Sequence, residues 1–170
     1  MRGAAPTGGK SPYITPQGYL RLQQELNALW ERRRDVARHL AAAAAEGDRS
    51  ENAEYIYRKK ELREIDRRIR YLQKRLPELK VVRETPADRE RVFFGARVTL
   101  ENGRGETVSY RIVGADEYDQ DKNCISVDSP LAKALLKKKL DDEVRVETPK
   151  GRNLYLLVDI AYGDKARNGE

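Results

Sequence analysis

Two long heptad repeats of apolar residues constrain the fold of this chain more than any other feature. The first repeat steps by 4 and 3 residues through Leu22, Leu26, Leu29, Arg33, Val36, Leu40 and Ala43. The second steps by 3 and 4 through Leu62, Ile65, Ile69, Leu72, Leu76 and Leu79. This spacing is typical of the apolar seam of a coiled-coil helix. The sequence therefore predicts two long helices that pack along these seams.

The two seams match when one helix is folded back on the other. The numbers of the paired residues then add to 101 or 102 throughout, which predicts an antiparallel hairpin with its turn at Ser50–Glu51. Each arm of about 30 residues is roughly 45 Å long at 1.5 Å per residue. Arg33 interrupts the seam, and we expect its stem to pack there while its guanidinium reaches water. The acidic segment 47–52 becomes the tip of the hairpin.

Local signals predict where both helices begin and end. Thr15-Pro16 marks the start of the first helix, because threonine is a good N-cap and proline suits the first helical position. Gly47 marks its end. We expect the second helix to start near Asp48 or Ser50, and Pro77 to stop or kink it.

After residue 91 the pattern changes from helical to strand-like. The strand candidates are Val92–Phe94, Arg97–Leu100, Val108–Val113, Ile125–Val127, Val144–Glu147 and Leu154–Ile160. Turn signals occur at 102–105 and 148–151, and Ser129-Pro130 predicts a short helix from about Leu131 to Lys139. The fold class is α+β. The predicted order is a disordered tail (1–12), the hairpin (13–83), a linker (84–90), a small sheet domain with one helix (91–163) and a frayed tail (164–170).

Composition narrows the class of protein. The net charge of +6 favours a polyanionic partner, and residues 52–80 hold ten Lys or Arg against five Asp or Glu. The single cysteine, Cys124, excludes an internal disulfide and a cysteine-rich zinc site, and it suits a reducing cytosol. No apolar run has the length of a membrane span, and no signal peptide is visible. We expect a soluble cytoplasmic protein.

The tip carries two carboxylates, Asp48 and Glu51, and their spacing has two interpretations. As a capping box, Asp48 is the N-cap of the second helix and Glu51 bonds back from the third position; spacing alone favours this. As a metal site, two carboxylates are too few for a closed Mg²⁺ site, so a partner has to supply the other ligands. That incompleteness argues against a self-sufficient enzyme. His39 has no nearby nucleophile, and no phosphate-binding loop or catalytic triad is visible.

A row of cations follows the tip along one side of the second helix, next to the apolar seam. It consists of Lys60, Arg63, Arg67, Arg70 and Lys74 and is called the stripe below. The stripe is either an ordinary solvated face, partly neutralised by neighbouring acids, or a track for a phosphate backbone. Tyr55 and Tyr57 near the tip could stack on bases, although Tyr55 is more simply a seam residue one heptad before Leu62.

These segments resemble the Gre family of bacterial transcript cleavage factors. The resemblance is carried by Gly-Asp-Arg-Ser-Glu-Asn-Ala-Glu-Tyr at 47–55 and Lys-Lys-Glu-Leu-Arg-Glu-Ile-Asp-Arg-Arg-Ile-Arg-Tyr-Leu at 59–72. Val-Phe-Phe-Gly-Ala at 92–96, Arg-Ile-Val-Gly at 111–114 and Ile-Ser-Val-Asp-Ser-Pro-Leu-Ala-Lys-Ala-Leu-Leu at 125–136 extend it. The match spans about residues 13–162. Arg49 and the heavy stripe are more similar to the GreB branch than to the GreA branch, whereas the extended N-terminus and Pro77 depart from it.

The resemblance implies a fold and a partner. The fold is an N-terminal antiparallel coiled coil followed by an FKBP-like domain. That domain is expected to dock at the rim of the secondary channel of bacterial RNA polymerase, through a loop that matches Asp128, Ser129 and Pro130. The hairpin then enters the channel of a backtracked complex and stimulates cleavage of the nascent RNA, rescuing arrested complexes.

The resemblance also assigns roles near the tip. Asp48 and Glu51 help to hold a second Mg²⁺ and position water, while the polymerase holds the first metal. Ser50, Asn52 and Tyr55 support the tip. Residues Lys60, Arg63, Arg67 and Arg70 are expected to hold the 3′ segment of the RNA. The protein is thus expected to be a monomeric cofactor of the polymerase rather than an enzyme, with a shared Mg²⁺ that the free protein does not bind.

Two other functions fit the same hairpin. A regulator would occupy the channel without promoting cleavage, although the intact Asp48 and Glu51 count against this. A plain coiled-coil interaction or chaperone module would use the tip acids only to cap a helix.

Overall fold

The computed structural model describes residues 9–47, 52–119 and 123–163. The tip residues 48–51 lie outside these ranges, as do most of the tails that were expected to be disordered or frayed. Contacts divide the chain into two compact units. One comprises residues 19–79, and the other comprises the residues before 19 together with those from 80 onward.

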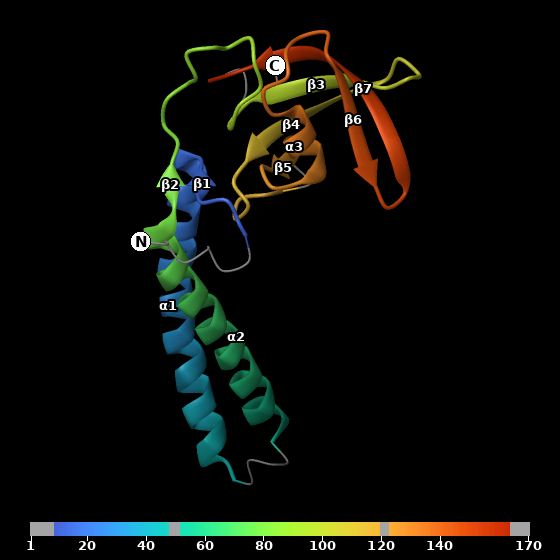
Figure 1. Ribbon diagram of the computed structural model, residues 1–170. Helices are drawn as coiled ribbons and strands as arrows, with labels where there is room; N and C mark the ends of the chain where they lie inside the picture. The colour runs from blue at the N-terminus through green and yellow to red at the C-terminus, as the bar shows by residue number, and fades with distance from the viewer. Residues whose placement is uncertain (1–8, 48–51, 120–122, 164–170) are drawn as a thin grey trace. The chain divides into compact units, whose positions relative to one another are not determined.

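The first unit is the predicted helical hairpin. Helix α1 spans Pro16–Ala45 and helix α2 spans Ala53–Arg75, and they lie side by side in Figure 1. Helix α1 begins as predicted, because Thr15 Oγ1 accepts a hydrogen bond from Gly18 N at 3.1 Å. The expected start of the second helix near Asp48 or Ser50 is wrong. Helix α2 begins at Ala53, and its N-cap is Asn52.

The seams form the core of the hairpin. The seam side chains with the lowest exposed fractions are Leu22, Val36, Ala43, Ile65, Ile69 and Leu72. Arg33, expected to reach water from the seam, keeps 37% of its side chain exposed and also donates from Nε to Asp66 Oδ1 of the other helix at 2.6 Å. The seam thus accepts one cation because a carboxylate from α2 satisfies it.

Pro77 ends helix α2 as predicted. The last turn continues as a 3₁₀ helix, η1, at Leu76–Glu78, and strand β2 (Lys80–Val81) comes next. Strand β2 pairs in parallel with β1 (Tyr13–Ile14), a contact that the sequence did not predict. Ser11 and Pro12, expected in a disordered tail, are bonded: Ser11 N to Asp128 Oδ2 and Pro12 O to Lys80 N, both at 2.8 Å.

The second unit contains a five-stranded sheet in the order β5-β4-β3-β7-β6, labelled in Figure 1. Its strands are β3 (Arg97–Glu101), β4 (Thr107–Val113), β5 (Cys124–Ser126), β6 (Glu143–Thr148) and β7 (Gly151–Ala161). Neighbouring strands are antiparallel except β4 and β5. Alternate residues of β3 and β6 point into a core that also includes side chains of helix α3 (Pro130–Leu135). The predicted sheet with one helix is therefore confirmed.

Two details of the sheet domain differ from expectation. Residues 92–94 are not a strand. Val92 is fully buried, and its N–H donates to Lys138 O at 2.9 Å, while Phe93 N donates to the hydroxyl of Tyr162 at 2.9 Å. Helix α3 ends at Leu135 rather than near Lys139, because Leu136 is extended and Lys137 has a φ of 70°. A left-handed residue cannot continue a right-handed helix.

A buried junction fixes the first turn of α1 within the second unit. Glu117 Oε1 accepts hydrogen bonds from Thr15 N and Gly114 N, both at 2.8 Å, and its Oε2 accepts one from the Thr15 hydroxyl at 2.5 Å. The carboxylate lies so close to Gly18 that a Cβ there would be 1.9 Å from Oε2. A side chain at position 18 would therefore displace the Glu117 carboxylate, which holds the start of α1.

Candidate functional site

The predicted metal-binding carboxylates, Asp48 and Glu51, lie outside the described residues, as does the tip-support residue Ser50. The structure does describe Asn52, the first residue after them. Asn52 has extended backbone angles (φ −86°, ψ 103°), and its side-chain oxygen accepts a hydrogen bond from Tyr55 N at 3.1 Å. It is therefore the N-cap of helix α2.

Asn52 also ties the two helices together beside the tip. Its Nδ2 donates to the carbonyl oxygen of Ala43 at 2.9 Å, and Ala43 is a buried seam residue of α1. One amide thus satisfies an orphan N–H of one helix and a terminal C=O of the other. Its role as tip support stays a prediction.

The position of this cap removes the capping-box interpretation of the two acids. In a capping box the N-cap residue and the third helical residue bond reciprocally. In helix α2 these positions belong to Asn52 and Tyr55, so neither Asp48 nor Glu51 occupies them. The sequence-based preference for Asp48 as the N-cap was wrong.

Tyr55, the other predicted tip-support residue, is half-buried. The Nζ atom of Lys59 lies 5.8 Å from the centre of its ring. Its backbone N–H is the group that Asn52 caps. Tyr55 thus belongs to the first turn of α2 and packs at the hairpin rather than pointing freely into solvent.

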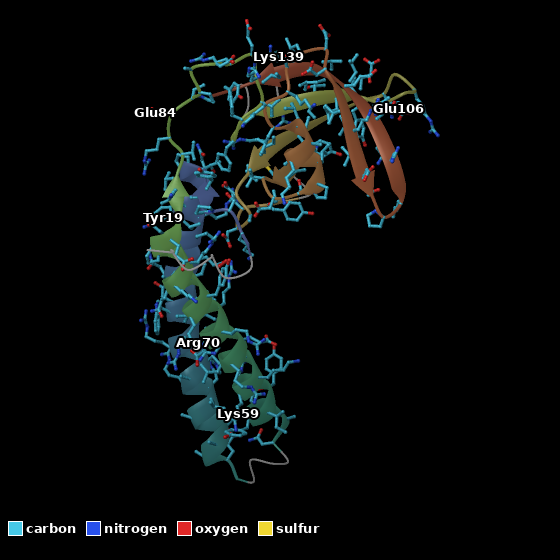
Figure 2. The ribbon with its side chains drawn as sticks, viewed as in Figure 1. Tyr19, Lys59, Arg70, Glu84, Glu106 and Lys139 are labelled. Carbon is cyan, nitrogen blue, oxygen red and sulfur yellow. The ribbon has the colours of Figure 1, made fainter. Side chains whose placement is uncertain are left out.

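All five cations of the stripe are exposed. At 3.6 residues per turn they lie on the opposite side of α2 from buried Ile65, Ile69 and Leu72, not next to the seam as expected. Figure 2 labels Arg70 of the stripe and Lys59, the residue before its first member. Within the ranges that the structure describes, no carboxylate forms an ion pair with any of the five.

Other cations of the hairpin are held by carboxylates. Glu61 of α2 accepts hydrogen bonds from Arg32 of α1, at 2.5 and 2.9 Å, and from Arg58, at 3.0 Å. Desolvation alone would raise the pKa of Glu61, but the hydrogen bonds from the two arginines outweigh it and lower that pKa. Arg68 forms a two-pronged contact with Glu25, at 2.9 Å for both bonds. The stripe thus takes no part in the ion pairs that the described residues of the hairpin form.

The predicted docking residues form the N-terminus of α3. Ser129 Oγ caps the helix by accepting from Ala132 N at 3.2 Å, and Pro130 is exposed at the first helical position. Asp128 precedes them, half-buried, and its Oδ2 accepts the hydrogen bond from Ser11 N. The structure thus brings the three residues together, but it also links Asp128 to the segment before β1.

An apolar groove of about 340 Å³ opens beside Pro130. Its lining residues are Tyr118, Ile125, Ser126, Ser129, Pro130, Leu131, Val146 and Thr148. Tyr118 is 47% exposed. Sequence reasoning missed this residue, because the groove is assembled from the loop before β5, the start of α3 and strand β6, and no local pattern joins these segments.

The described residues contain no group of three or more His, Cys, Asp or Glu side chains that could hold a metal ion. His39 is exposed, and its Nδ1 lies 2.8 Å from the carbonyl oxygen of Asp35 in its own helix. No described helix has both the length and the apolar character needed to span a membrane.

Comparison with known proteins gives matches over nearly the whole chain. The family described as "Transcription elongation factor, N-terminal" matches residues 12–81, and "Transcription elongation factor, GreA/GreB, C-term" matches residues 86–162. The chain is 56% identical over 163 residues to transcription elongation factor GreB of Xanthomonas axonopodis pv. citri, covering 95% of this chain and 97% of the relative. It is 62% identical over 143 residues to GreB of Haemophilus influenzae, covering 84% and 90%.

Among solved structures, the crystal structure of GreA factor homolog 1 (Gfh1) of Thermus thermophilus is similar, with 28% identity and a TM-score of 0.42. The match covers 89% of this chain and 99% of that one. The structure of Gfh1 from Thermus aquaticus gives 29% identity and a TM-score of 0.41, with 91% and 99% covered.

Proposed function

The chain belongs to the GreA/GreB family of transcription elongation factors, and we propose that it stimulates cleavage of backtracked RNA by RNA polymerase. In this proposal the hairpin enters the secondary channel of the polymerase. Asp48 and Glu51 act there on the extruded 3′ end of the nascent RNA. The factor is a cofactor of the polymerase rather than an enzyme, because two tip carboxylates are too few for a closed metal site and the described residues contain no cluster of metal ligands.

The observation that carries the proposal is the cap of helix α2. Because Asn52 caps this helix and bonds to Ala43 O, the two acids are not needed to start it. Two carboxylates at the end of a hairpin whose longer helix has 30 residues, or about 45 Å, are well suited to reach into a partner. A role in capping helix α2, which competed with this function, no longer accounts for Asp48 and Glu51.

The carboxylates of Asp48 and Glu51 fit a magnesium site that is shared with a partner. Mg²⁺ is commonly held by one or two carboxylates while waters and phosphates complete six ligands, and the described residues add no further cluster of ligands. When bound, a second Mg²⁺ supplies activation of water and charge stabilisation in phosphodiester hydrolysis. Asp48 and Glu51 provide carboxylate oxygens and can orient a water, and the polymerase and RNA supply the other oxygens.

The stripe is the proposed contact for the RNA. Its exposed cations, which have no carboxylate partner in the described part of the chain, follow α2 from Lys60 to Lys74. This stretch extends for about 21 Å at 1.5 Å per residue. Phosphates require such repeated cations but no base-specific groups.

The sheet domain is the proposed anchor. Ser129 and Pro130 line an apolar groove, and Asp128 precedes them in the chain. An exposed apolar groove suits a protein partner. Docking through this domain leaves the hairpin free for the channel, in keeping with the division of the chain into two compact units.

One experiment tests the proposal against both alternatives. The protein is added to stalled, backtracked polymerase, and the length of the RNA is followed over time. A cleavage factor shortens the RNA faster than the polymerase alone does. A channel blocker would bind and leave the RNA intact or slow its cleavage, and a plain coiled-coil module would neither bind nor shorten it.

A further inference from the structure

Two exposed apolar side chains lie at the tip end of the stripe, Ile56 in line with its cations and Tyr57 about 100° further round the helix. Ile56 is 52% exposed and Tyr57 is 60% exposed. Ile56 lies four residues before Lys60 and Tyr57 lies three before it, so both are neighbours of the first cation on the helix surface. Single exposed apolar residues need no explanation. Two adjacent ones at the end of a row of cations indicate a contact surface.

The ring of Tyr57 is backed on one side by a fixed cation. The guanidinium carbon of Arg58 lies 5.5 Å from the centre of the ring. Arg58 is held in turn by Glu54, at 2.8 Å, and Glu61, at 3.0 Å. With Arg58 on one side and 60% of the residue exposed, another face of the ring is open to solvent. A ring fixed in this way loses little freedom on binding.

We propose that the open face of Tyr57 stacks on a nucleobase of single-stranded RNA. The inference rests on the proposed function and adds to it a base-binding subsite at the tip end of the stripe. Aromatic side chains beside a cationic groove bind single strands of any sequence, because every base has a π-face. The exposed cations of the stripe, for which the described residues show no ion pair, favour a polyanion over an apolar protein surface.

Two substitutions of Tyr57 distinguish the effect of its aromatic ring from the effect of its apolar surface, and a third substitution elsewhere is the control. Tyr57→Leu keeps an apolar side chain but has no π-face, and Tyr57→Phe restores the ring. We expect Tyr57→Leu to raise the concentration of factor needed for half-maximal cleavage by about 5- to 150-fold, and Tyr57→Phe to recover it. Trp30→Leu is the matched control, since Trp30 is an exposed aromatic residue of the other helix (38%). Circular dichroism verifies that each variant is folded.

A change in the RNA tests the same contact from the other side. An abasic nucleotide replaces each of the 3′-terminal residues in turn. At the stacked position the loss caused by the abasic site and the loss caused by Tyr57→Leu are expected not to add. Additive losses, or a Tyr57→Leu variant that behaves like the wild type, would overturn the proposal. A fourth variant, Tyr57→Ala, distinguishes another partner: if it loses activity while leucine and phenylalanine are tolerated equally, the residue contacts the polymerase instead.

A crosslink tests the subsite without relying on cleavage. RNA that carries 5-iodouridine near its 3′ end is irradiated in the backtracked complex, and the labelled peptide is identified. We expect a crosslink at Tyr57 that Tyr57→Leu abolishes. If the wild-type factor binds but fails to stimulate cleavage, the proposed function fails while the crosslink still decides the subsite. Labelling elsewhere on α2, with none at Tyr57, contradicts the stacking.

Discussion

Replacing Asn52 is expected to weaken the hairpin next to its tip. Asn52→Ala removes both the cap on Tyr55 N and the bond to Ala43 O. An N-cap contributes about 0.5–2 kcal/mol, and a hydrogen bond contributes about 0.5–1.5 kcal/mol. The variant should therefore lose about 1–3.5 kcal/mol of hairpin stability.

Asn52→Asp is the control that separates the two bonds. Aspartate keeps an oxygen for Tyr55 N but lacks the Nδ2 donor to Ala43 O, and its negative charge favours a helix N-terminus. Its loss should be at most about 1.5 kcal/mol. Urea unfolding, followed by far-ultraviolet circular dichroism, measures the free energy of unfolding of both variants. The signal reports on the hairpin because much of the protein's helix lies in α1 and α2.

The order of stabilities decides whether the cap assignment is right. We expect the wild type to be the most stable, Asn52→Asp to be intermediate or close to it, and Asn52→Ala to be the least stable. Amide exchange in the first turn of α2 should quicken in the alanine variant. Three equal stabilities, with unchanged exchange at Tyr55 N, would refute the assignment and would return the capping role to the residues of the tip.

Three further predictions concern the stripe, Glu61 and Asp128. Reversing the charges of Arg63 and Arg67 should impair RNA cleavage most in deeply backtracked complexes. It should also reduce the salt dependence of binding, by about 0.7 unit of log affinity per tenfold salt for each phosphate that is no longer neutralised. Equal impairment at every backtracking depth would exclude an RNA contact. Glu61 has a lowered pKa in the folded hairpin, so its stabilising effect is complete above its ordinary value of 4.5 and disappears as the pH falls through the lowered value. Acid unfolding of Glu61→Gln should accordingly depend less on pH than that of the wild type, and identical profiles would contradict the coupling. Asp128→Ala should weaken polymerase binding. Ser11→Pro, which removes the backbone donor to that carboxylate together with the hydroxyl that accepts from Tyr13 N, should not. Equal losses would mean that Asp128 acts by holding the segment before β1.

The long hairpin was predictable because its information is local and repeated. Seam residues such as Val36 and Ile69 recur at heptad spacing, and both are buried in the structure. Thr15-Pro16 and Pro77 are also local signals, and both marked helix ends correctly. The sheet strands and the turn at 102–105 were predictable from β-prone runs and glycine.

The features that the sequence did not predict depend on contacts between distant residues. Asp48, Ser50 and Asn52 are all good N-caps, and only the hairpin partner Ala43 favours Asn52. The two-residue pairing of β1 with β2 joins residues 13–14 to residues 80–81, and Glu117 bonds to Thr15 across 102 positions. Such short or single contacts leave no periodic pattern in the chain.

The central claim is that Asp48 and Glu51 complete a magnesium site in the polymerase. The most direct measurement is the rate of RNA cleavage against Mg²⁺ concentration, for polymerase alone, with the wild-type factor and with the Asp48→Asn/Glu51→Gln double variant at saturating concentration. The account predicts that the wild type shifts the half-maximal Mg²⁺ concentration well below that of polymerase alone. The double variant should bind the polymerase but leave that concentration unshifted. A double variant that shifts the half-maximal Mg²⁺ concentration as far as the wild type does would contradict the proposed metal role of Asp48 and Glu51.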